Sequence, residues 1–221
     1  MWSLRFRRWR RARLGTVAAE LKACWRAPLP SPATPFNRLE LLVCDGEMSG
    51  LDPARDELLS LGWVRISGGE QVLGSAELHL IRPRGSVGSS ATVHRLRDFD
   101  LAAAESADEV LRRFLAAAQG RVLVFHHAPL DRAFLDALAL RAFGAPLLLP
   151  VIDTLALERR QLLRREAAVA PGALRLQACR ERYGLAAHAA HSALADAVAT
   201  GELLLAHVAR RGPGLRLRDL Y

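Results

Sequence analysis

Two acidic side chains stand two residues apart at the end of an apolar run. Asp45 and Glu47 follow the run at 39–44. In an extended strand, residues i and i+2 lie on the same face, so both carboxylates point to one side. Carboxylate oxygens are the ligands that hard divalent cations prefer. The pair therefore predicts a shared metal site, and its alternative is a pair of solvent-facing charges near a turn.

Two later segments carry further candidate groups. Asp131 lies in the first turn of a helix expected at 129–143, where the helix dipole alone also favours an acid. His191 and Asp196 stand five residues apart at the start of the last expected helix. Five residues rotate a helix by about 500°, which would leave His191 and Asp196 about 140° apart around the helix axis. The two residues can border one cleft if His191 lies in the junction before the helix. An acid buried there needs a partner, so Asp196 is expected to be exposed or to face a metal ion.

The order of apolar runs predicts a mixed α/β domain. Strands are expected at 39–44, 57–66, 71–81, 121–125 and 150–153, and helices at 106–118, 129–143, 154–166, 173–182 and 192–208. The first three strands are separated only by turn signals, which indicates an antiparallel meander. The later strands alternate with helices, so the layout predicts a mixed sheet with helices on its faces.

Composition excludes several classes of protein. The 221 residues are 51% hydrophobic and 24% charged, which is typical of a globular chain and too apolar for a disordered one. No run reaches the ~18–20 apolar residues that a membrane-spanning helix needs. Three cysteines with no CxxC spacing indicate neither a disulfide framework nor a structural zinc site. A reducing compartment, the cytoplasm, is expected.

The net charge of +8 is concentrated at the N-terminal end, where residues 1–37 contain eight basic residues and one acid. Trp2, Phe6, Trp9, Val17 and Leu21 lie roughly along one face of a helix, which predicts a basic amphipathic extension. Such a helix binds an anionic membrane, phosphates or a protein partner, and its alternative is a solvated arm. The extension is expected to be dispensable for turnover.

Prolines mark the expected boundary between this extension and the main domain. The segment 27–35 has four prolines in nine residues and predicts a stiff linker. The chain is expected to divide into the basic extension with its linker at 1–37, a catalytic domain at 38–210 and a short C-terminal tail at 211–221.

Three segments, in this order, resemble the exonuclease motifs of the DnaQ-like DEDDh 3′–5′ exonucleases. They are VCDGEMSGL at 43–51, HHAPLDRAFL at 126–135 and HSALADA at 191–197. The segment at 151–160 is similar to the family's DTL segment, and Val93-His94 to its substrate-side histidine. The resemblance spans about residues 39–208. It implies an RNase H-like fold, in which helices flank a mixed five-stranded sheet.

The resemblance also implies roles for individual residues. The family's four acids match Asp45, Glu47, Asp131 and Asp196. Two Mg²⁺ or Mn²⁺ ions are implied, one held chiefly by Asp45, Glu47 and Asp196 and the other by Asp45 and Asp131. His191 matches the general base. Ser192 occupies the position where the sister class has its tyrosine, so the histidine subclass is the better match.

The residues that match substrate-binding positions are Met48, Ser49, Gly50, Leu51, His94 and His127. Leu51 matches the apolar wedge that helps unstack the terminal base, and Met48 is expected to line the same pocket. Core packing is the alternative for both. Met48-Ser49 replaces the family's common Thr-Thr and is closer to oligoribonucleases, whereas His127 replaces an asparagine.

The resemblance implies a 3′–5′ exonuclease that releases nucleoside 5′-monophosphates from single-stranded or frayed DNA 3′ ends. An RNA exonuclease of the RNase T or oligoribonuclease kind and a non-catalytic nucleic-acid-binding module are the alternatives. A DNA polymerase or another protein is a candidate partner for the basic N-terminal helix. Only a short segment follows the last expected helix, which favours a stand-alone or loosely associated nuclease.

Overall fold

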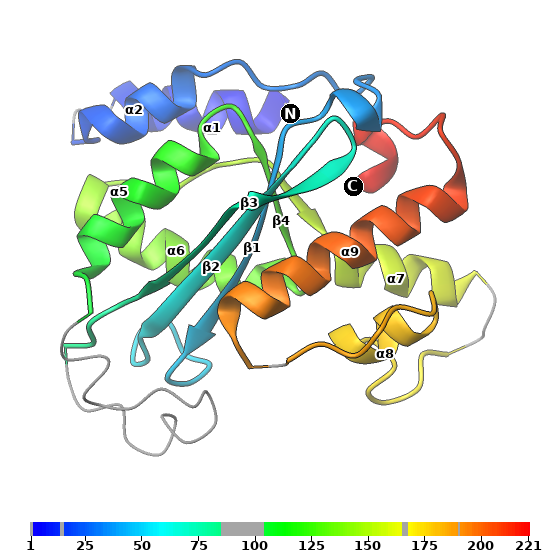
Figure 1. The fold of residues 1–221 in the computed structure, drawn as a ribbon. Helices are drawn as coiled ribbons and strands as arrows, with labels where there is room; N and C mark the ends of the chain where they lie inside the picture. The colour runs from blue at the N-terminus through cyan, green and yellow to red at the C-terminus, as the bar shows by residue number, and fades with distance from the viewer. Residues whose placement is uncertain (1, 14–15, 85–103, 165–167, 190) are drawn as a thin grey trace.

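The computed structural model describes residues 2–13, 16–84, 104–164, 168–189 and 191–221, and all structural statements refer to these. A five-stranded sheet with strand order β3-β2-β1-β4-β5 forms the centre (Figure 1). The strands are β1 (Leu41–Met48), β2 (Leu58–Ser67), β3 (Glu70–Leu80), β4 (Val122–Phe125) and β5 (Val151–Asp153). β1, β2 and β3 pair antiparallel, whereas β4 and β5 run parallel to β1. The predicted mixed sheet is confirmed.

Side chains of β1 alternate between two hydrophobic cores. Leu42 and Cys44 belong to one core, and Leu41 and Val43 to the other. This period of two is the geometry of an extended strand. β1 extends beyond the predicted end at Cys44 to Met48, so the acids at 45 and 47 lie within the strand, on the face of Leu41 and Val43.

Helices cover both faces of the sheet. The core that contains Leu42 is closed by α2 (Ala19–Arg26), α5 (Ala107–Ala118) and α6 (Ala128–Phe143). The opposite core is closed by α7 (Thr154–Leu163), α9 (Ala193–Arg211) and the 3-10 turns η1 (Phe36–Arg38) and η2 (Leu217–Leu220), and α8 (Leu176–Glu181) packs beside α9 (Figure 1). Ser106 caps α5 as predicted, in a capping box with Glu109.

The N-terminal segment packs on the domain, which agrees with the amphipathic character of the predicted extension and differs from the alternative of a solvated arm. It forms α1 (Trp2–Arg13) and α2, and both Leu21 and Cys24 are buried in the core. The side chain of Arg8 is buried and donates from Nε to the carbonyl of Leu148 at 2.8 Å. Phe6 and Trp9 stay exposed on α1, so a partner at this helix stays a prediction.

The segments on either side of the expected boundaries also join the core. Pro35 pairs with Arg216, and the amide of Phe36 donates to the carbonyl of Leu215 at 2.9 Å. Leu217 is fully buried. Within the described ranges, no helix combines the length and the apolar character that crossing a membrane requires.

Replacing Leu21 with alanine is expected to destabilise the whole domain. Leu21 is fully buried, and truncating a buried leucine typically costs about 2–5 kcal/mol. Urea unfolding measures the change, with Phe6→Ala as the control because Phe6 is 60% exposed. Equal effects of the two substitutions would contradict the packing of α2. Because Leu21 and Cys24 lie in the core, truncation through residue 35 is expected to unfold the protein, in contrast to the dispensable extension expected from the sequence.

Candidate active site

Three carboxylates meet at one edge of the sheet. Asp45 and Glu47 come from β1, and Asp196 comes from the first turn of α9. One oxygen from each lies within 4.8 Å of the others, and Glu47 is buried. The structure therefore brings together three of the four acids that the sequence singled out, at a spacing that one cation can bridge.

A glycine allows α9 to approach β1 this closely. Gly62 of β2 lies opposite Asp45 in the ladder. A Cβ at this position would lie 2.4 Å from the amide nitrogen of Leu194 and 2.5 Å from the carbonyl carbon of Ala193. Any side chain larger than hydrogen would push the start of α9 away from the sheet. No local sequence pattern indicates this role of Gly62, because the role depends on a helix that begins 131 residues later.

Asp131 lies on the other side of β1, near the start of α6. Its Oδ1 accepts a hydrogen bond from the amide of Gly46 at 3.1 Å, and only 5% of the residue is exposed. His127 precedes α6 with a left-handed φ of 78°, and its amide donates to Asp153 Oδ1 at 3.0 Å. These bonds fix the helix start, and therefore Asp131, relative to β1.

Burial and mutual repulsion raise the pKa values of these acids. Burial raises the pKa of Glu47 to about 7, with a further contribution from Asp196. Burial also raises the pKa of Asp131 to about 8, and the pKa of Asp45 lies well above its usual range through burial and the neighbouring carboxylates. Crowded anionic oxygens form the ligand set that suits Mg²⁺ or Mn²⁺, so these residues fit a divalent metal site.

The metal-free protein is expected to lose stability as the pH rises from about 5 to about 8.5. An acid with a pKa higher in the folded than in the unfolded state binds more protons when folded, so raising the pH between the two values destabilises the fold. The pKa of Glu47 rises from 4.5 to about 7 on folding, which corresponds to a loss of about 3 kcal/mol in the free energy of unfolding. Urea unfolding in EDTA measures it, and stability that rises over this range would contradict the prediction. Mn²⁺ should reduce the loss, because it binds the ionised carboxylates.

Two histidines contact Asp196. His191 donates from its backbone amide to Asp196 Oδ2 at 3.0 Å, while its side chain is exposed and its φ is 66°. His188 Nε2 lies 2.6 Å from Asp196 Oδ1, and its Nδ1 lies 3.1 Å from Gln177 Oε1. His188 is not among the residues expected at the site, because only His191 has the family's spacing to Asp196. The contact of His188 depends on an irregular segment whose path has no sequence signal.

The predicted substrate-side residues have different environments. Leu51 is 78% exposed in the loop after β1, whereas Met48 is buried in the core, which is the packing alternative for that residue. Ser49 Oγ accepts from the amide of Glu57 at 2.9 Å, which ties this loop to β2. At Gly50 a Cβ would lie within 2.6 Å of the Asp56 carboxylate, so the residue leaves room for that side chain. His127 is exposed, and His94 lies outside the described residues.

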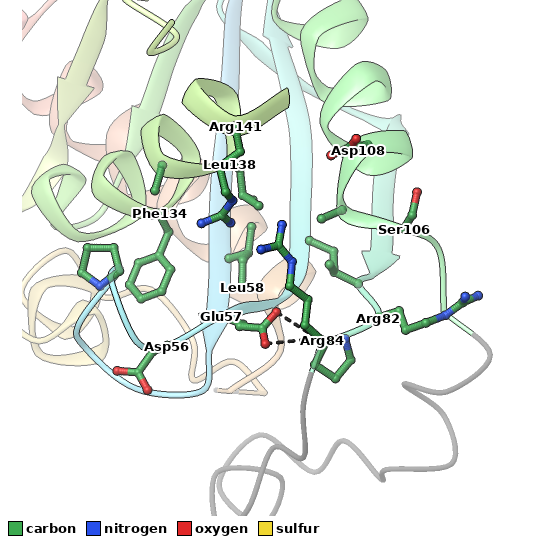
Figure 2. Close-up of a pocket in the computed structure, with 15 residues that line it drawn as sticks. Asp56, Glu57, Leu58, Arg82, Arg84, Ser106, Asp108, Phe134, Leu138 and Arg141 are labelled. Carbon is green, nitrogen blue, oxygen red and sulfur yellow. Dashed lines mark hydrogen bonds between the residues drawn. The ribbon is translucent and has the colours of Figure 1, made fainter. Parts of the chain in front are cut away.

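A cavity of about 280 Å³ borders the same end of β1 (Figure 2). Leu58 and Phe134 line it, and Leu58 Cδ1 lies 2.7 Å from the position that a Cβ on Gly46 would take. The guanidinium groups of Arg84 and Arg141 point toward one another above Leu58 in Figure 2. Neither group has an ion pair with any residue in the described ranges.

The fold and the acidic cluster define the class. The structure of the zinc-bound form of the E. coli exonuclease I complex with single-stranded DNA superposes with a TM-score of 0.68 at 19% identity, covering 79% of this chain and 41% of that chain. The predicted RNase H-like fold is confirmed. The chain belongs to the exonuclease family, whose model matches residues 42–204.

Sequence relatives agree with this assignment. A DNA polymerase III subunit epsilon-like protein of Rhodobacter capsulatus is 36% identical over 85% of this chain and 26% of its own length. A PolC-type DNA polymerase III of Thermotoga maritima is 33% identical over 78% of this chain and 12% of its own length. The chain thus spans about a quarter or less of these relatives, and the predicted DnaQ-like family is confirmed.

Proposed function

We propose that this protein is a metal-dependent 3′–5′ exonuclease that releases nucleoside 5′-monophosphates from single-stranded or frayed DNA 3′ ends. The observation that carries the proposal is the cluster of Asp45, Glu47 and Asp196 oxygens within 4.8 Å, with Asp131 adjacent through the amide of Gly46. A structural role alone does not account for acids crowded at such electrostatic cost. The solved exonuclease I complex with single-stranded DNA supports this substrate class.

Each acid has a distinct part in this proposal. Asp45, Glu47 and Asp196 would hold one divalent ion, and Asp45 with Asp131 a second. When bound, such ions supply Lewis acidity and neutralise charge on the transferred phosphoryl group. The amide of Gly46 orients the Asp131 carboxylate, and α9 brings Asp196 against β1.

The exposed imidazole of His191 takes the proton from the attacking water, as general base. The backbone amide of His191 donates to Asp196 Oδ2, so the position of His191 is fixed relative to the proposed metal ligand Asp196. Leu51 projects from the loop after β1, where its exposed side chain separates the terminal base from the next one.

A ladder assay tests the proposal. The purified protein is incubated with 5′-labelled single-stranded DNA, or with RNA of the same sequence, in Mg²⁺, Mn²⁺ or EDTA. Shortening from the 3′ end that requires metal and releases nucleoside 5′-monophosphates is the expected result, with DNA degraded faster. Faster degradation of RNA would assign the protein to the RNA exonucleases, and no shortening in any metal would leave a binding module.

Replacing Arg141 with glutamine is expected to raise the KM for oligonucleotides about tenfold with little change in kcat. Arg84 and Arg141 lie on the cavity beside the site (Figure 2), where the strand's upstream phosphates would pass. A charge-assisted hydrogen bond contributes about 1.5–3 kcal/mol, and about 1.4 kcal/mol is a factor of ten.

The p-nitrophenyl ester of thymidine 5′-monophosphate has no upstream phosphate, so the wild type and Arg141→Gln should hydrolyse it at equal rates. Arg112→Gln is the matched control, since Arg112 lies on α5 outside this cavity. An equal loss on the ester and the oligonucleotide would show that Arg141 acts elsewhere.

A further inference from the structure

A second cationic cavity lies between α7, the C-terminal end of α9 and η2. Its volume is about 220 Å³, several times the roughly 30 Å³ of a water molecule. Four arginines line it, and Asp219 is the acidic residue in its lining. The arginines are Arg160, Arg164, Arg211 and Arg218.

Three of these four guanidinium groups have no acidic partner. Within the described ranges Arg164, Arg211 and Arg218 form no ion pair, and Asp219 Oδ2 accepts from the amide of Arg216 at 2.9 Å. Arg160 donates to the terminal carboxylate oxygen of Tyr221, and Arg211 donates to the main-chain oxygen of Asp219 at 3.1 Å. The cationic groups outnumber the anionic ones and repel one another, which an anion in the cavity would relieve.

A buried histidine supplies an independent observation. His207 is 3% exposed and lines this cavity, and its Nε2 is buried without a hydrogen-bond partner among the described residues. Its Nδ1 lies 3.2 Å from Glu158 Oε1 and 3.1 Å from the Tyr183 hydroxyl. Glu158 is itself held by Tyr183 at 2.6 Å and Arg182 at 3.1 Å. The imidazole is therefore fixed in orientation, with one nitrogen unsatisfied.

We propose that this cavity binds a phosphate group through the four arginines that line it, with His207 donating from Nε2 in its imidazolium form. Arginine donors match phosphate oxygens in number and direction, and a buried ring nitrogen without a partner is costly. The C-terminal end of α9 carries a partial charge of about −0.5, which four guanidinium groups outweigh.

This phosphate site is separate from the carboxylate cluster. His207 lies eleven residues after Asp196 on α9, about 16 Å along the helix axis, toward the C-terminal end of that helix. The phosphate comes either from a free anion or nucleotide or from a nucleic-acid backbone that crosses the far face, and the second source rests on the proposed function.

Binding is tested on the full chain in EDTA, so that no turnover is needed. Inorganic phosphate and thymidine 5′-monophosphate are titrated calorimetrically into the wild type, Arg164→Gln/Arg218→Gln and the control Arg159→Gln. Arg159 is exposed on α7 and does not line this cavity. We expect affinity to fall at least tenfold in the double variant and to stay within twofold in the control.

Two further measurements separate the sources of phosphate. Fluorescence anisotropy measures the affinity for labelled single-stranded DNA. An affinity that falls in the double variant but not in Arg159→Gln assigns the site to the nucleic-acid backbone. Weakened binding of free phosphate alone assigns it to a free anion or nucleotide. The ¹⁵N shift of His207 Nε2 should move on ligand addition in the wild type, a readout that needs no variant of a buried residue. If no probe distinguishes the double variant from Arg159→Gln and the shift stays constant, the phosphate site is refuted.

Discussion

Replacing Asp196 with asparagine is expected to lower kcat by about a thousandfold or more. Asp196 supplies one of three carboxylate oxygens within 4.8 Å, and the amide cannot replace its charge. A catalytic metal ion contributes several kcal/mol of transition-state stabilisation, and each 1.36 kcal/mol corresponds to a factor of about ten. Single-turnover rates on labelled DNA measure the loss. Retention of more than about a tenth of the activity would refute the role of Asp196.

The same substitution is expected to stabilise the metal-free protein at about pH 8.5. Asp196 contributes to the raised pKa values of Asp45 and Glu47, so removing its charge relieves repulsion within the cluster. An amide can still accept from His191 N–H, which preserves the start of α9. A rise in urea midpoint together with lost turnover separates the loss of a metal ligand from misfolding.

Replacing His191 with alanine is expected to lower kcat by about a thousandfold, within the range of 10²–10⁴ typical of general bases. The side chain is exposed and takes no part in a hydrophobic core, so stability should change little. Single-turnover rates at saturating metal measure this change.

His188→Ala should give a different result. His188 bonds to Asp196 Oδ1 at 2.6 Å and orients it, so its loss should weaken metal binding about 10–100-fold. Raising the Mn²⁺ concentration should restore most of the activity of His188→Ala but none of that of His191→Ala. The reverse pattern would identify His188 as the base.

Much of the fold could be predicted from local patterns. The antiparallel meander is predicted by apolar runs separated by Gly and Pro, and α5 by its N-cap Ser106 and its apolar face. These signals involve residues close in the chain, so one sequence suffices to detect them. The place of α2 could not be predicted in this way, because an apolar face that includes Leu21 does not indicate which surface of the domain it packs against, although Leu21 is fully buried.

For the candidate site, the acidic residues could be predicted from the spacing at the end of β1 and from three motifs in order. How these residues meet depends on the folded chain, because Gly62 admits α9 against the sheet and His188 reaches Asp196 through an irregular segment. The unpaired Nε2 of His207 among arginines likewise results from chain segments that meet only on folding. Such contacts depend on packing between distant residues, whereas strand and helix patterns are set by neighbours a few residues apart.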